Sequence, residues 1–226
     1  MSFAKKIGAA LLFVAFAGLG TFPFAAGPTP FRPWKIEGFV NATENYTRLD
    51  VTIHSNGKPV TGLKVRIMDH PAEDRGGGVY GCLVQESLAV PGSPLTVTLQ
   101  AAGAAGQVAP TLTATITPVR QIVVHSPSDQ AHVAAITPKL SASWSGGAAP
   151  YTLTVQEAEQ PNNTVYGAQN LVEKTHAIPM NHCQPGKEYL VNVFCWTGPF
   201  AFDHPVDSSS SFVLIQRSPY VHLHVR

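Results

Sequence analysis

The sequence predicts an all-β protein in which two β-sandwiches follow each other along the chain. Nineteen glycines and nineteen prolines separate short runs rich in Val, Ile and Thr, a pattern typical of many strands joined by tight turns. The turn Pro185-Gly186 leads into a run whose alternate residues Tyr189, Val191 and Val193 can face one core. A tyrosine placed directly after such a turn can hydrogen-bond the backbone upstream of it, the tyrosine corner of β-sandwiches.

The composition excludes several classes of function. Charged residues make up 13% of the 226 residues and the formal net charge is +1, so no basic stripe is offered to nucleic-acid phosphates. The nucleophile motif G-x-S-x-G is missing, and no cysteine stands in a C-x-x-C pair that would suggest structural zinc. We therefore expect a non-enzymatic protein that needs no cofactor and has no nucleic-acid partner.

The N-terminal segment predicts export. Lys5 and Lys6 precede an uncharged run from Ile7 to Gly20, which is the layout of a secretory signal peptide. Residues 1–26 are interpreted as this signal peptide or, if the apolar run persists to Phe24, as an uncleaved N-terminal anchor. Residues 27–33 are expected to form a linker. The predicted location is secreted, periplasmic or at the cell surface, with membrane contact only if the segment is uncleaved, and the Ala- and Pro-rich character suggests a bacterial protein.

Residues 34–118 are predicted to form the first sandwich. Asn56-Gly57 is a strong hairpin signal, since both residues tolerate a positive φ. The stretch from Gly57 to Val65 resembles the G-x-P-V-x-G-x-x-V pattern of bacterial immunoglobulin-like domains. The expected strands span Trp34 to Asn41, Arg48 to His54, Leu63 to Met68, Val79 to Val84, Leu95 to Leu99 and Thr111 to Thr117.

Residues 119–226 are predicted to form the second sandwich. The region from about residue 121 to 216 resembles a fibronectin type III domain through Trp144 in an early strand, the Pro185-Gly186 turn and Tyr189 at the head of an alternating strand. That resemblance implies a fold and an extracellular binding role, and it implies no chemistry. The expected strands span Leu140 to Trp144, Tyr151 to Val155, His176 to Met180, Glu188 to Trp196 and Ser211 to Ile215.

The three cysteines Cys82, Cys183 and Cys195 are expected to be free thiols. If Tyr189 to Trp196 is one strand, Cys195 lies about 20 Å beyond the tyrosine at ~3.3 Å per residue, while Cys183 stays in the turn at the other end. A disulfide tolerates Cα separations of only about 4.4–6.8 Å. In the fibronectin resemblance, Cys183 also stands where a core leucine is usual.

Two sets of side chains are candidate sites. His222 and His224 would share one face of a strand and are weak candidates for metal ligands, against the alternative of an edge strand with a polar outer face. Trp196, Phe200 and Phe202 cluster at the far end of the Tyr189 strand. Such aromatic tips bind sugars, peptides or partner subunits, or else close the open end of a sandwich.

The function that we expect is that of an exported structural or recognition protein. It would bind a protein partner in a cell-surface or extracellular assembly, through loop tips or unpaired strand edges. The alternatives are an exported metal- or small-ligand-binding protein that uses the C-terminal histidines, or an accessory domain of a secreted hydrolase. Three N-x-S/T sequons begin at Asn41, Asn45 and Asn162 and leave glycosylation open.

Overall fold

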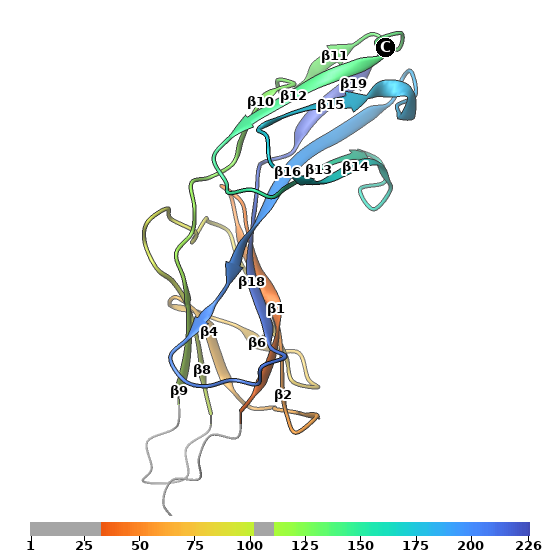
Figure 1. The fold of residues 1–226 in the computed structure, drawn as a ribbon. Helices are drawn as coiled ribbons and strands as arrows, with labels where there is room; N and C mark the ends of the chain where they lie inside the picture. Colours follow the sequence, from red (N-terminus) through yellow and green to blue (C-terminus); the bar gives the residue numbers. More distant parts are fainter. Residues whose placement is uncertain (1–32, 102–110) are drawn as a thin grey trace, which may run out of the picture. The chain divides into compact units, whose positions relative to one another are not determined.

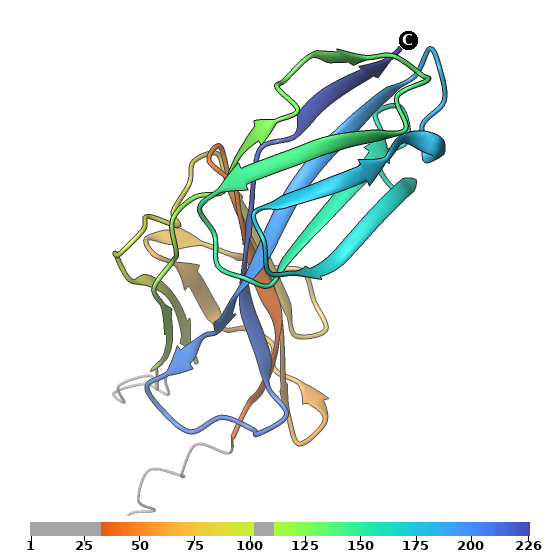
Figure 2. The same cartoon turned by 45° about the horizontal axis from the view of Figure 1, so that its top comes forward.

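The computed structural model describes residues 33–101 and 111–226, whose regular secondary structure consists of β-strands apart from one 3-10 turn (Figures 1 and 2). The expected signal peptide and all but the last residue of the expected linker lie outside the described residues. The predicted all-β class is confirmed, since the strands of the described residues form an 11-stranded, a 5-stranded and a 3-stranded sheet. Within the described ranges, no helix is long and apolar enough to cross a bilayer.

The first sandwich buries alternate residues of its strands between two sheets. Leu49, Val51 and Ile53 of one sheet, and Leu95 and Val97 of the other, are almost fully buried. One layer contains β1 (Lys35–Ala42), β2 (Thr47–Ser55), β3 (Lys58–Pro59), β6 (Glu73–Asp74) and β7 (Val79–Val84), which are part of an 11-stranded sheet that continues into the second sandwich. The other contains β4 (Lys64–Ile67), β5 (His70–Pro71), β8 (Leu95–Gln100), β9 (Thr111–Ile116) and β17 (Ala201–Phe202).

The second sandwich has the same construction around its own core. Trp144, Tyr151 and Tyr189 lie in this core, and the Trp144 and Tyr151 rings meet edge to face at 5.5 Å. One layer contains β11 (Ala131–Val133), β13 (Tyr151–Glu157), β14 (Thr164–Leu171), β16 (Glu188–Pro199) and β19 (Val221–Val225). The other contains β10 (Val123–Ser126), β12 (Lys139–Ser145) and β15 (Thr175–Pro179), which is followed by a 3-10 turn, η1 (Met180–His182).

A segment from the second half of the chain pairs with strands of the first half. Strand β18 (Ser211–Arg217) runs parallel to β1, with partners from Glu37↔Ser211 to Ala42↔Gln216, and β17 pairs with β9. The same β18 also pairs with the far end of β16. The expectation that residues 119–226 form a self-contained sandwich does not account for this pairing. The reason is that alternation within 211–217 fixes which face is buried but not which neighbouring strand is paired.

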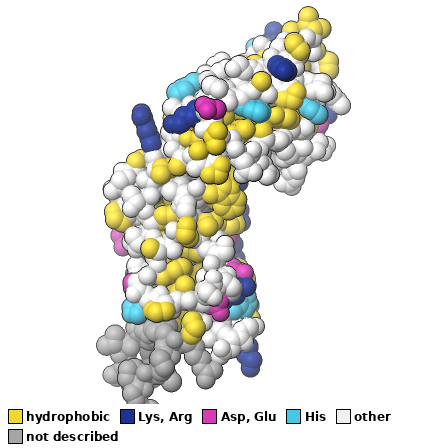
Figure 3. Space-filling view, viewed as in Figure 1, with side chains coloured by type: hydrophobic (Ala, Val, Ile, Leu, Met, Phe, Trp, Pro, Cys, Tyr) yellow, Lys and Arg dark blue, Asp and Glu magenta, His cyan; other side chains and the backbone are white. Residues whose placement is uncertain are grey.

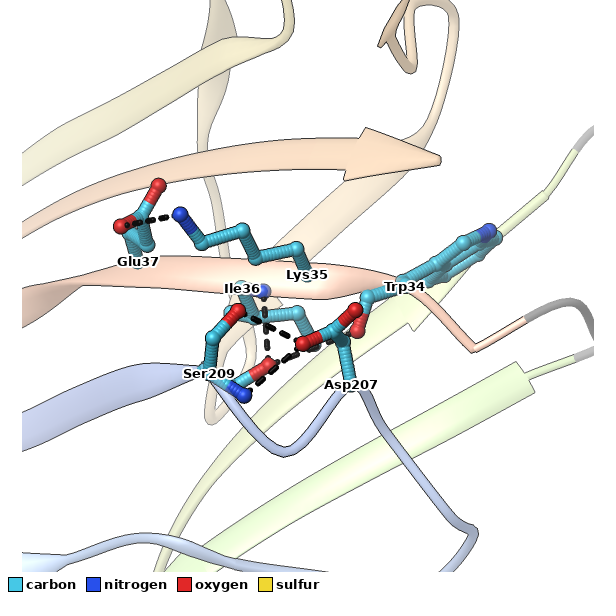
Figure 4. Close-up of polar contacts among 7 residues, drawn as sticks. Trp34, Lys35, Ile36, Glu37, Asp207 and Ser209 are labelled. Atoms are coloured by element: carbon cyan, nitrogen blue, oxygen red, sulfur yellow. Dashed lines mark hydrogen bonds and ion pairs between the residues drawn. The ribbon is translucent and has the colours of Figure 1, made fainter. Parts of the chain in front are cut away.

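Polar contacts of the turn before β18 attach it to the start of β1 (Figure 4). The Asp207 backbone N–H donates to the Trp34 carbonyl at 2.9 Å, and the Asp207 carboxylate accepts from the Ser209 N–H at 2.8 Å and the Ser209 hydroxyl at 2.6 Å. The Ile36 N–H donates to the Ser210 hydroxyl oxygen at 3.0 Å. These bonds set the register in which β18 enters the sheet beside β1.

Candidate interaction surface

Tyr189 fixes the beginning of β16, the strand on which the candidate surface is built. Its side chain is fully buried, and the Gln184 backbone N–H donates to the Tyr189 hydroxyl oxygen at 2.6 Å. The predicted tyrosine corner is therefore present, five residues back along the chain. With Tyr189 facing the core, Val191, Val193 and Cys195 face it too, so that the alternate positions of β16 point outward.

The outward positions near the end of β16 are aromatic. Phe194 is half-buried and pairs with Thr152 of β13, while Trp196 is 50% exposed. The chain has three tryptophans, and the other two, Trp34 and Trp144, are 8% and 3% exposed. Because burying an indole removes a large apolar area from water, the half-exposed Trp196 is a candidate contact residue on this sheet face.

Trp196 borders a hollow of about 170 Å³ on this outer face. No charged side chain lines the hollow, but the guanidinium of Arg217 lies over the Phe194 ring at 4.3 Å from its centroid. Its lining combines two aromatic rings with one hydroxyl and two amides and consists of Pro150, Thr152, Gln169, Asn170, Phe194 and Trp196. We call these six residues the Trp196 hollow.

A β-bulge in β14 brings the two amide side chains to the hollow. The pairing of β14 with β13 shifts by one residue between Leu171↔Tyr151 and Ala168↔Leu153, so that the extra residue falls at Gln169-Asn170. Asn170 has φ +57°, in the left-handed region that asparagine tolerates better than most residues. Bulges re-aim side chains, and here both residues line the hollow together with Trp196.

The unpaired strand edges are less suited to binding a partner than the sheet face. Among the described sheets, β14 is an edge strand of eight residues, and the remaining edge strands have at most five. A second shift of register between Tyr166↔Val155 and Thr164↔Gln156 leaves β14 with only three consecutive regular residues, Tyr166 to Ala168. Short and bulged edges are the devices by which sheets avoid adding strands, so the edges are poor docking sites compared with the Trp196 hollow.

Phe200 and Phe202 are placed differently from Trp196. Phe200 is 3% exposed and stacks on Phe212 of β18 with ring centroids 4.4 Å apart. Phe202 is half-buried on β17, opposite Ala114 of β9. Phe200 therefore fills the first sandwich as a core residue. Of the three aromatic candidates, Trp196 is the one that solvent reaches freely.

The two C-terminal histidines lie half-buried on β19 with their ring nitrogens engaged. His222 Nδ1 contacts the Glu188 carboxylate, and His224 Nε2 contacts Gln130 Oε1 at 2.7 Å. The His224 ring also stacks on His132 of the parallel strand β11, with centroids 4.9 Å apart. Within residues 33–101 and 111–226, no three His, Cys, Asp or Glu side chains are grouped to hold a metal ion.

The three cysteines are free thiols, as the strand geometry predicts. Cys195 is buried on the inner face of β16, and Cys82 and Cys183 are half-buried. Burial raises the pKa of the Cys183 thiol to about 11, and burial likewise raises the pKa of Cys82 and Cys195. All three therefore stay protonated near neutral pH and are poor nucleophiles.

Charged groups are sparse on the molecular surface. The face in Figure 3 carries scattered Lys, Arg, Asp and Glu side chains between hydrophobic and neutral polar atoms. The described ion pairs include Lys187 Nζ to Glu157 Oε1 at 3.2 Å and Arg75 Nη1 to Asp50 Oδ1 at 2.8 Å, both at the surface. With a formal net charge of +1, long-range electrostatic steering is a minor factor for this protein.

Comparisons with known proteins give similarity only at the level of solved structures. No family model matches the chain, and no curated protein matches its sequence. A chimeric titin Z1Z2–Z1Z2 tandem is 15% identical and covers 86% of this chain and 100% of its own, with a TM-score of 0.27. The titin fragment I67–I69 is 7% identical over 85% of this chain (TM-score 0.28), and the chicken CNTN1 FN1–FN3 domains are 12% identical over 84% (TM-score 0.29). The chain spans 65% and 63% of these last two structures, and at such TM-scores the likeness assigns no property to it.

Proposed function

We propose that this protein is a non-enzymatic, exported recognition module that binds a protein partner in a cell-surface or extracellular assembly. The observation that carries the proposal is the Trp196 hollow, where a half-exposed indole borders an uncharged depression on the outer face of β13, β14 and β16. Contact surfaces of this kind are enriched in tryptophan and depleted of charge at their centre. The basic, apolar N-terminal segment of the sequence supports export.

The proposed mode of binding is through the sheet face rather than an added strand. Trp196 and Phe194 supply the apolar contact, and Thr152, Gln169 and Asn170 supply hydrogen-bonding groups around it. The sandwiches act as a rigid support, since Tyr189 and the core behind β16 hold the strand from its inner side. A preformed surface on a strand loses little conformational entropy when it binds.

Site-specific photo-crosslinking in intact cells tests this proposal. A photo-reactive amino acid at Gln169, within the hollow, should yield a discrete crosslinked partner. The same amino acid at Ser141, which is also exposed but lies on β12 of the opposite layer, serves as the matched control. The adduct at position 169 should disappear in a Trp196→Ala background. No adduct at position 169, or an equal adduct at 141 that is indifferent to Trp196→Ala, contradicts the proposal.

A further inference from the structure

The Trp196 hollow combines features that restrict the chemistry of its ligand. Its volume of about 170 Å³ lies below the ~300–1,000 Å³ of pockets that enclose drug-sized ligands. The hollow therefore receives one small ring or side chain, with the remainder of the ligand lying outside it. No charged side chain lines it, and the Arg217 guanidinium nearby is engaged over the Phe194 ring at 4.3 Å, so the lining itself offers no ion pair to an ionic ligand group.

The polar groups of the hollow are available to a ligand. In the described part of the chain, the side chains of Thr152, Gln169 and Asn170 make no hydrogen bond to another protein group. Together they offer a hydroxyl and two amides, each able both to donate and to accept. A ligand group with hydroxyls can hydrogen-bond to them directly, whereas a purely apolar group makes no use of them.

The aromatic part of the hollow requires a flat apolar surface on the same ligand. Trp196 presents half of its indole to solvent, and Phe194 lies beside it on the same face of β16. A pyranose ring has one face of C–H bonds, which packs on an aromatic ring, and a rim of hydroxyls, each of which donates and accepts. This combination matches an indole bordered by amides and a hydroxyl.

We propose that the Trp196 hollow is a binding site for one neutral sugar ring, carried on the partner that the recognition module binds. The inference rests on the proposed function, since it assigns the ligand chemistry of the same surface. The sugar stacks its C–H face on Trp196, and its hydroxyls bond Gln169, Asn170 and Thr152. The bulge at Gln169-Asn170 serves to direct these two amides toward the ring.

Titration of the full-length protein with neutral saccharides tests the proposal. Trp34 and Trp144 are buried, so a ligand-induced change in tryptophan fluorescence reports on Trp196. A panel of glucose, galactose, mannose, N-acetylglucosamine and their short oligomers should include a ligand that gives a saturable change.

Variants of the hollow test whether a saccharide binds at this site or changes the fluorescence in another way. The double variant Gln169→Ala/Asn170→Ala keeps the fluorescent reporter and should weaken binding about tenfold or more through lost hydrogen bonds. Trp196→Ala, followed by calorimetry, should abolish binding, and Tyr220→Ala, another exposed aromatic outside the hollow, should leave it unchanged. Absence of a saturable response to every saccharide overturns the sugar proposal, as does binding that survives Trp196→Ala.

The outcome also separates this inference from the proposed function. If saccharides fail but the crosslink at Gln169 persists and depends on Trp196, the recognition surface stands and its ligand is a protein side chain. If saccharides bind but no crosslinked protein forms at Gln169, the site is a glycan site and the protein-partner proposal is wrong. If both experiments fail, both proposals fall.

Discussion

The side-chain amide of Gln216 forms a pair of hydrogen bonds with the backbone of Val119. The Val119 N–H donates to Gln216 Oε1 at 2.9 Å, and Gln216 Nε2 donates to the Val119 carbonyl at 2.9 Å. Gln216 is fully buried, and its Oε1 also accepts from the Thr197 hydroxyl at 2.9 Å. The Gln216 side chain of β18 thus bonds both backbone groups of a residue in the segment that connects β9 to β10, in the way that the backbone of a neighbouring strand would.

Replacing Gln216 with leucine should lower the free energy of unfolding by roughly 2–4 kcal/mol. The volume is nearly kept, but the buried Thr197 hydroxyl loses its acceptor at about 1–3 kcal/mol, and the N–H and C=O of the half-buried Val119 add less because water can reach them. Chemical denaturation measures the effect. The control is Gln121→Ala, since Gln121 is half-buried nearby and makes a single 3.2 Å bond to the Arg217 carbonyl. Equal decreases in the free energy of unfolding for the two variants would show that the Gln216–Val119 hydrogen bonds contribute no particular stability.

Phe200→Ala and Trp196→Ala should differ sharply in their effect on stability. Phe200 is buried and stacked on Phe212, so its truncation should cost about 3–5 kcal/mol. Trp196 is half exposed, and its truncation should cost about 1 kcal/mol or less. Urea titrations of both variants check the contrast. A large loss for Trp196→Ala would make this residue a structural one and remove the main argument for a contact surface.

The Cys183 thiol should react slowly with iodoacetamide at pH 8 and faster as the pH approaches 11. Burial raises its pKa to about 11 from the ordinary value of 9.0. Alkylation followed by mass spectrometry over a pH series, with the denatured chain as reference, measures this. Linkage sets the sign for stability: the thiol ionises first in the unfolded chain, so the folded state loses stability as pH rises from about 9 to 11. A Cys183 reaction rate that levels off near pH 9 contradicts the burial account.

Gly146→Ala should lower the free energy of unfolding far more than Gly62→Ala. Both glycines have a positive φ, +77° and +72°. A Cβ on Gly146 would lie 1.8 Å from the Gln121 carbonyl oxygen, whereas a Cβ on Gly62 meets nothing within 4 Å. Gly62→Ala should therefore cost about 1–2 kcal/mol from backbone strain alone, and Gly146→Ala clearly more. Thermal unfolding compares the two, and similar melting temperatures would contradict the close approach.

The sequence predicts strands well where one face is buried without interruption. Residues 47–55, 95–100 and 188–196 alternate regularly, and they form β2, β8 and most of β16. Strand β14 is absent from the expectations because its two bulges break the two-residue period between Thr164 and Leu171. Both parallel pairings, β1 with β18 and β11 with β19, were also missed, since local alternation carries no information about distant strand partners.

The candidate site could be predicted only in part for the same reason. Trp196 is a candidate from the sequence because aromatic residues gather around a turn at the end of its strand. The sequence groups Phe200 with Trp196 because Phe200 follows the same turn. In the structure, Phe200 is instead buried against Phe212 in the core of the first sandwich. Gln169 and Asn170 carry no pattern of their own, and only the bulge brings them to Trp196.

Oxidative footprinting of Trp196 in intact cells tests the central claim most directly. The measurement compares hydroxyl-radical oxidation of each aromatic residue in the purified protein and in intact cells, with Tyr220, 44% exposed, as the internal reference. A recognition surface at the Trp196 hollow predicts rapid oxidation of Trp196 in the purified protein and severalfold protection in cells, with Tyr220 unchanged. Equal oxidation of Trp196 in both settings would contradict the account.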